Sequence, residues 1–199
     1  MQVGWADGVK DRVGGALMAH LVELDGVRPT IGEGVYLAPT AILIGNVHIG
    51  DRATVWFGAV LRGDFSRIEV GARSSIQDNA VLHCAIDLPT IVAEDVTVGH
   101  GALLEGCVVE AGALVGMGAI VLHHARVGAR AVIAAGGVVA ERQEVAPGML
   151  VAGVPASEKK ELSGSAQRWA EIASDDYQQL RSRYLNASVV QTSDAHLSV

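Results

Sequence analysis

Most of the chain carries an aliphatic residue at every sixth position. The first unbroken run is Ile31, Leu37, Leu43, Ile49, Val55 and Leu61, and later runs of the same spacing start at Val70, Val92 and Val109. A small or short apolar residue stands four positions after most of these aliphatics, and glycine often follows them directly. A period of six differs from the 3.6 of a helix and the 2 of an ordinary strand. It predicts short strands that alternate with tight turns, with each aliphatic side chain pointing inward.

Three such units make one coil of about 18 residues, and stacked coils bury a continuous column of side chains. We therefore predict a mainly β fold, a parallel β-helix over residues 18–156. A β-sandwich with regular strands is the alternative. It is less favoured, because a sandwich does not require the six-residue spacing to persist through so many repeats. The frame breaks at residues 62–69 and 84–90, which we expect to be excursions from the coil of the kind that often carry function.

After Pro155 the spacing of apolar residues changes to that of a helix, predicted over residues 157–185. Its apolar face is expected to pack along the outside of the coil, within reach of a neighbouring subunit; the face consists of Leu162, Ala166, Trp169, Ala173, Tyr177, Leu180 and Tyr184. Residues 1–17 and 186–199 show little pattern, and we expect disorder there.

The composition narrows the possible partners. The chain of 199 residues is 50% hydrophobic but only 4% aromatic, and it has 24 glycines, which suits a narrow, repetitive core. The net charge is -7, and the sequence has no basic run, which argues against nucleic acid and anionic membranes as partners. An apolar run of the roughly 20 residues that span a bilayer is also missing. The two cysteines cannot form a disulfide framework, so we expect a reducing, cytoplasmic location.

Polar residues line up on one predicted face of the coil. The stacked inward residues of this face are Leu43, Leu61, Leu82, Leu104, Val121 and Val139, and the residues after them point outward. Three adjacent coils thereby present Arg62, His83 and Glu105. Since neighbouring strands lie about 4.8 Å apart, His83 and Glu105 could share one ion. His100 lies near the preceding corner and should face another edge, so a threefold trimer would bring it against His83 and Glu105 of the next chain.

Four stretches, "LRGDFSRIEVGARSSIQDNAVLH", "VTVGHGALLEGC", "VGMGAIVL" and "VAGVPA", resemble the γ-class carbonic anhydrase-like branch of the hexapeptide-repeat proteins. The chain is most similar there to accessory proteins of phenylacetate and carnitine catabolism. The resemblance implies a left-handed β-helix, a homotrimer and metal sites between subunits. The implied ligands are His83, His100 from the neighbouring chain and Glu105, where the family normally has histidine. Two histidines and a carboxylate suit Zn²⁺, with Fe²⁺ as an alternative.

The resemblance also implies roles for five other residues. Arg62 and Asp64 match an ion pair that joins subunits in the family, and Asp78 matches an aspartate near the same interface. Gln77 matches a glutamine that orients the water at the metal. Tyr177 matches a helix tyrosine that reaches toward the site.

The implied activity is reversible hydration of CO2 to bicarbonate by metal-activated water. Hydrolysis of an acyl-CoA thioester and a non-catalytic trimeric scaffold with a decayed site are the alternatives. An acyltransferase is less favoured, because the histidines follow the metal pattern and nothing is specific for CoA. The alternative for Glu105 is a salt bridge to Arg62 or to a neighbouring arginine, with no metal present. Cys84 is a possible spare ligand, and His123 and His124 are expected to be solvated surface residues.

Overall fold

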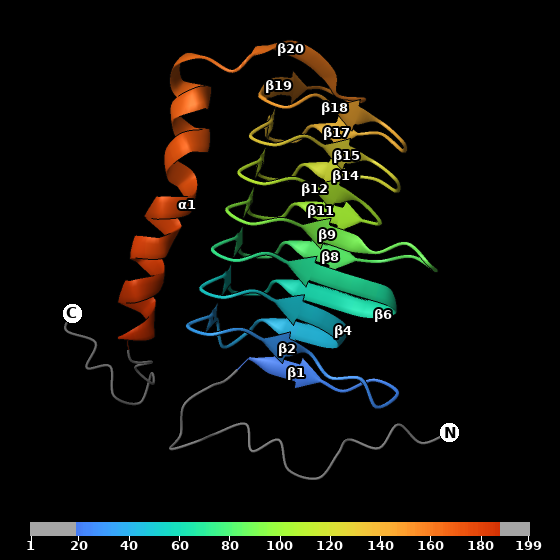
Figure 1. Ribbon diagram of the computed structural model, residues 1–199, viewed down its shortest axis with the longest axis vertical. Helices are drawn as coiled ribbons and strands as arrows, with labels where there is room; N and C mark the ends of the chain where they lie inside the picture. Colours follow the sequence, from blue (N-terminus) through green and yellow to red (C-terminus); the bar gives the residue numbers. More distant parts are fainter. Residues whose placement is uncertain (1–18, 188–199) are drawn as a thin grey trace, which may run out of the picture.

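The computed structural model describes residues 19–187. The chain winds into a parallel β-helix with one long helix alongside it (Figure 1). The predicted fold class, a mainly β parallel β-helix followed by a C-terminal helix, is confirmed. The predicted disordered segments, residues 1–17 and nearly all of 186–199, lie outside the described residues.

Two sheets form the faces of the coil. The twelve-stranded sheet contains β1 (His20–Val22), β2 (Thr30–Ile31), β4 (Ile42–Ile49), β6 (Val60–Val70), β8 (Val81–His83), β9 (Thr90–Val92), β11 (Leu103–Glu105), β12 (Val108–Val109), β14 (Ile120–Val121), β15 (Arg126–Val127), β17 (Val138–Val139) and β18 (Glu144–Val145). The eight-stranded sheet contains β3 (Tyr36–Leu37), β5 (Thr54–Val55), β7 (Ser75–Ile76), β10 (Thr97–Val98), β13 (Leu114–Val115), β16 (Val132–Ile133), β19 (Met149–Ala152) and β20 (Ser157–Glu161). The larger sheet covers two faces, because the long strands β4 and β6 run around one corner.

The inward aliphatics stack in the predicted register. Leu43 pairs with Leu61, Leu61 with Leu82, and Leu82 with Leu104, and the ladder continues through Val121 to Val139. All six are between 0% and 1% exposed. Their burial in one continuous column stabilises every coil through its two neighbours and holds the outward residues beside them at fixed heights.

Both breaks in the repeat keep some backbone pairing. Residues 62–69 belong to strand β6 and do not form a separate loop. The extra residues are accommodated where the register with β4 shifts, between Gly45 and Val47. Gly45 has a φ of 69°, and a Cβ there would lie 2.5 Å from the carbonyl oxygen of Gly63, so this crossing requires glycine. The second break is closed by a bridge between Ala85 and Leu88.

The C-terminal helix is shorter than predicted. Helix α1 begins at Gly164 and ends at Leu185, whereas residues 157–161 form β20, which pairs antiparallel with β19. The helix pattern in the sequence does not reveal this pairing, because it depends on the open edge of the last coil. As predicted, α1 packs along the outside of the coil, where Tyr177 and Leu180 contact a cluster of Tyr36, Ala38 and Trp56. No helix among residues 19–187 is long and apolar enough to cross a membrane.

Candidate metal centre

Arg62, His83 and Glu105 stand at matching positions of three neighbouring strands. Arg62 of β6 pairs with His83 of β8, and His83 pairs with Glu105 of β11. The outward positions follow from the inward ones, because successive residues of a strand point to opposite faces. The parallel register therefore produces the row of side chains that the six-residue spacing predicts.

His83 lies between two carboxylates. Its Nδ1 is 2.6 Å from Oε1 of Glu105, and its Nε2 is 2.9 Å from Oδ1 of Asp64. Arg62 in turn donates a hydrogen bond to Oδ2 of Asp64. The pair of Arg62 and Asp64 thus lies within one chain, and its predicted role between subunits stays a prediction.

Both carboxylates are held in the ionised form. Partial burial alone would raise the pKa of Asp64, but hydrogen bonds from Arg62 and His83 outweigh burial and lower it. Burial also opposes ionisation of Glu105, whose pKa is nevertheless lowered by its hydrogen bond to His83 and by the nearby charges of His83 and His123. With Nε2–H donated to Asp64, an ion shared by His83 and Glu105 would take the place of the proton between Nδ1 and Oε1.

A cavity of about 600 Å³ opens beside this row. Its lining includes Phe65, His83, Ile86, Leu88, Glu105 and His123. The ring centroids of Phe65 and His83 are 5.9 Å apart, in an edge-on arrangement. Phe65 and Ile86 are largely exposed, so the cavity is open to solvent on its outer side, while the two carboxylates contact the imidazole nitrogens. The second break in the repeat supplies Ile86 and Leu88 to this cavity, and its functional role stays a prediction.

His100, Gln77 and Tyr177 meet on another face of the coil, where they line a separate cavity of about 480 Å³. The backbone N–H of His100 donates to Oε1 of Gln77 over 3.1 Å, and Nδ1 of His100 lies 2.8 Å from Oδ2 of Asp78. Gln77 is 5% exposed, so its side chain is fixed in place. Burial is the largest of the effects that raise the pKa of Tyr177, which therefore remains a neutral phenol.

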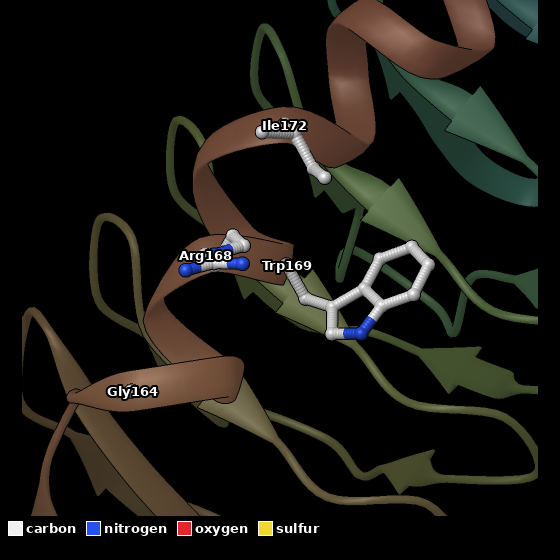
Figure 2. A pocket seen from close by; sticks show the side chains of 4 residues that line it. All are labelled: Gly164, Arg168, Trp169 and Ile172. Carbon is white, nitrogen blue, oxygen red and sulfur yellow. The ribbon is translucent and has the colours of Figure 1, made fainter.

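Trp169 forms another part of the wall of this second cavity. Figure 2 shows its indole directed from α1 toward the coil, next to a hollow of about 420 Å³ that Arg168 and Ile172 also line. Trp169 is 60% exposed, so this part of the predicted apolar face of the helix is only partly covered.

One chain therefore carries two groups of predicted site residues. Arg62, Asp64, His83 and Glu105 form the first group, on the β8–β11 face. Gln77, Asp78, His100 and Tyr177 form the second, close to helix α1. His83 contacts Glu105 directly, as its place in the predicted row requires, and His100 lies at a different edge, as predicted. The shared ion stays a prediction. The joining of the two groups across a trimer stays a prediction.

His123 is a contact of Glu105 that the sequence does not predict. Its Nε2 lies 3.2 Å from Oε2 of Glu105, although His123 was expected to be a solvated surface residue. It belongs to the turn after β14 and comes one 18-residue coil after Glu105. That spacing was the available signal. The residue that directly follows the inward aliphatic of this coil is Leu122, so a row defined by that position does not include His123.

Cys84 is near enough to His83 to be considered as a ligand. Asp64, His83 and Cys84 have potential metal-binding atoms within 4.8 Å of one another. They are the one such group of three side chains among residues 19–187. The Sγ of Cys84 is fully buried, accepts a hydrogen bond from the backbone N–H of Ser66 and donates one to the carbonyl oxygen of Arg62. We infer that Cys84 anchors the first break in the repeat and that its thiol is committed to the backbone.

Comparison with known proteins identifies the family of the chain. The model of the bacterial transferase hexapeptide (six repeats) matches residues 28–63. The chain is 40% identical over 141 residues to γ-carbonic anhydrase 2, mitochondrial, from Arabidopsis thaliana, an alignment that covers 68% of this chain and 51% of the plant protein. The chain thus spans about half the length of that relative.

Two further proteins are matched over most of their own length. A probable carbonic anhydrase from Methanocaldococcus jannaschii is 42% identical over 133 residues, which cover 67% of this chain and 84% of the relative. The crystal structure of a hexapeptide transferase family protein from Anaplasma phagocytophilum superposes with a TM-score of 0.79 at 35% identity and covers 83% of this chain and 98% of that one. On these matches and on the repeat itself, the chain belongs to the γ-carbonic anhydrase-like group of the hexapeptide-repeat proteins.

Proposed function

We propose that the protein is a metal-dependent enzyme of the carbonic anhydrase type, which activates water for reversible hydration of CO2 at a site between subunits of a homotrimer. His83 and Glu105 of one subunit and His100 of a neighbour would hold the ion. The observation that carries this proposal is the contact of 2.6 Å between Nδ1 of His83 and Oε1 of Glu105 on adjacent strands.

The residues present fit a zinc or iron(II) ion. Imidazole nitrogen and carboxylate oxygen both bind Zn²⁺ at about 2.0–2.2 Å, so two ligands of a tetrahedral site lie about 3.4 Å apart. The two atoms now share a hydrogen bond at 2.6 Å and would need to separate by less than about 1 Å. Metal-binding histidines usually donate their other ring N–H to a carboxylate, as Nε2 of His83 is placed to do toward Asp64.

The residues around the proposed ion would orient its ligands and the water molecule. Arg62 keeps Asp64 ionised, and Asp64 fixes the tautomer and orientation of His83. Gln77 uses its oxygen to hold the backbone of His100, which leaves its amide N–H groups free to orient a water molecule. A bound ion would supply the acidity that activates water near neutral pH. The negative charge of Glu105 reduces that acidity, so we expect slower hydration than with histidine at this position.

Metal analysis of the purified protein, together with stopped-flow CO2 hydration, tests the proposal. We expect about one ion per chain and a rate that disappears with His83→Ala or with chelation. The variant Glu105→His serves as the comparison for the third ligand. If only this variant hydrates CO2, the natural protein is not a carbonic anhydrase; a metal-free protein without a rate above buffer would lead to the same conclusion.

The placement of the site between subunits has its own test. His83→Ala and His100→Ala chains would be refolded as a mixture. Every mixed trimer then has an interface that joins an intact His83 from one chain to an intact His100 from the other. We expect the mixture to recover metal binding that each variant lacks alone. No recovery in trimers shown to be mixed would place the site elsewhere.

The cavity next to His100 favours hydrolysis of a thioester as a second candidate function. It is lined mainly by apolar side chains, among them Leu114, Met117 and Val132. The hydroxyl of Thr97 in its wall is buried and has no hydrogen-bond partner among the described residues, so a polar atom of a ligand could pair with it. Release of thiol from a panel of aryl and aliphatic acyl-CoA esters is the assay, and a panel without release above buffer would remove this candidate.

A further inference from the structure

The carboxylate of Glu105 lies between imidazoles from the coil before it and the coil after it. Its Oε1 is 2.6 Å from Nδ1 of His83, and its Oε2 is 3.2 Å from Nε2 of His123. Each oxygen thus faces its own histidine. The row Asp64, His83, Glu105 and His123 alternates carboxylate and imidazole across successive coils.

The turn that carries His123 is fixed by backbone hydrogen bonds on both sides. The N–H of His124 donates to the carbonyl of Gly106 over 2.7 Å, and the carbonyl of His123 accepts from Arg142 over 3.0 Å. A Cβ added to Gly106 would lie 3.1 Å from the imidazole of His123, so the ring sits close over the backbone that follows Glu105. The coil therefore fixes the backbone that carries the imidazole.

The ring nitrogen nearest Glu105 lacks another partner. Nε2 of His123 is buried and makes no well-aligned hydrogen bond within residues 19–187. A buried N–H without an acceptor is unfavourable, and the nearby carboxylate oxygen is the acceptor that a small rotation of the side chains would align.

We propose that His123 is a positioning residue for Glu105: it holds Oε2 of the carboxylate so that Oε1 stays turned toward His83 and toward the ion that this pair binds. This inference rests on the proposed metal centre. Glutamate has more rotatable bonds than the histidine that the family normally has at this position, so it needs a partner to keep one orientation. His123 supplies that partner from the next coil.

The structure favours this role over direct ligation by His123. Its Nε2 lies 3.2 Å from Oε2 of Glu105, whereas Nδ1 of His83 faces the other oxygen, Oε1, so His123 approaches the carboxylate from the side away from His83. A contact through the outer oxygen of Glu105 leaves the inner oxygen free for the ion. Partners of this kind typically change metal affinity by about 10–100-fold when they are removed.

Titration of the metal-free, full-length protein with Co²⁺ tests the proposal, with the dissociation constant and the visible absorption spectrum as readouts. The amide nitrogen of glutamine reaches nearly the position of the histidine Nε2, whereas that of asparagine stops near Nδ1. We expect His123→Ala and His123→Asn to weaken Co²⁺ binding by about 10–100-fold and to alter the spectrum, and His123→Gln to stay close to the wild type. His124→Asn is the matched control, since it changes the adjacent exposed histidine of the same turn, and asparagine tolerates its positive φ.

The outcomes separate the two proposals. If the wild type binds Co²⁺ and His123→Ala and His123→Asn bind it with the same affinity and spectrum, His123 does not position the ligand and the inference is overturned. Equal weakening in all three His123 variants also overturns it, because the effect would then not depend on a donor at Nε2. If the wild type itself binds no Co²⁺, the metal centre is wrong and the inference falls with it. Circular dichroism and the elution volume of each variant show whether it is folded and assembled.

Discussion

Replacement of Gln77 by leucine would remove the acceptor that holds His100 while nearly keeping the volume of the side chain. The bond from the His100 N–H to Oε1 of Gln77 is 3.1 Å long and only partly buried. The net contribution of such a bond is about 1 kcal/mol, and a donor left without a partner can cost about 1–3 kcal/mol. For a domain of this size, about 1 kcal/mol corresponds to a fall in Tm of about 2–4 °C.

The functional effect of Gln77→Leu should be larger than its effect on stability. A histidine that is no longer held at its backbone enters the proposed site in several orientations, and the expected loss of metal affinity is about 10-fold or more. Gln77→Glu is the control, because it keeps an acceptor oxygen at the same place and should retain most of the Tm. The measurements are thermal unfolding at one protein concentration, since an oligomer melts in a concentration-dependent way, and Co²⁺ titration. The reasoning fails if Gln77→Leu melts with the wild type and binds Co²⁺ equally well.

Three further predictions concern the scaffold. Arg73 lies 2.7 Å from Asp95 and 2.6 Å from Asp175 of helix α1, so Arg73→Met should lower the free energy of unfolding at pH 7 by about 1 kcal/mol, a value limited by solvent exposure. Burial opposes ionisation of Asp95, but hydrogen bonds from Ser174 and Arg73 lower its pKa below the ordinary value of 3.8. The stabilisation of the fold by ionised Asp95 is therefore complete above about pH 4 and is lost as the pH falls further. The urea midpoints of Arg73→Met and the wild type should accordingly converge in acid. Leu82→Ala, at a fully buried position of the column, should reduce stability by about 3–5 kcal/mol in urea unfolding, and a loss below about 1 kcal/mol would contradict the tight packing assigned to it. Burial raises the pKa of Cys107 to about 12, so iodoacetamide should label this thiol slowly at pH 8 unless urea is added, and rapid labelling of the native protein would be inconsistent with its burial.

The sequence was sufficient for the stacking of the coils. A period of six with inward aliphatics fixes which residues share a face, so the register from Leu61 through Leu82 to Leu104 could be predicted without a structure. The contact of His83 with Glu105 follows from that register. Local spacing is informative here because each coil packs only against its two neighbours.

Features that depend on contacts between distant parts of the chain could not be predicted from the spacing of residues. The pairing of residues 157–161 with β19 arises from an open sheet edge, and a local pattern does not report such an edge. The approach of His123 to Glu105 depends on how the turn after β14 is placed over Gly106. The separate cavity beside His100 exists because helix α1, about 70 residues later in the chain, covers that face.

The reversed direction of β20 closes the eight-stranded sheet at its C-terminal end. Every other pairing between named strands is parallel, but Leu150 pairs antiparallel with Lys160, and Glu158 and Glu161 add charge to the same strand. An exposed strand of this length would otherwise be a template for the backbone of another molecule. The eight-stranded sheet therefore ends in a charged strand of opposite direction, which opposes head-to-tail addition of a second parallel column along this face.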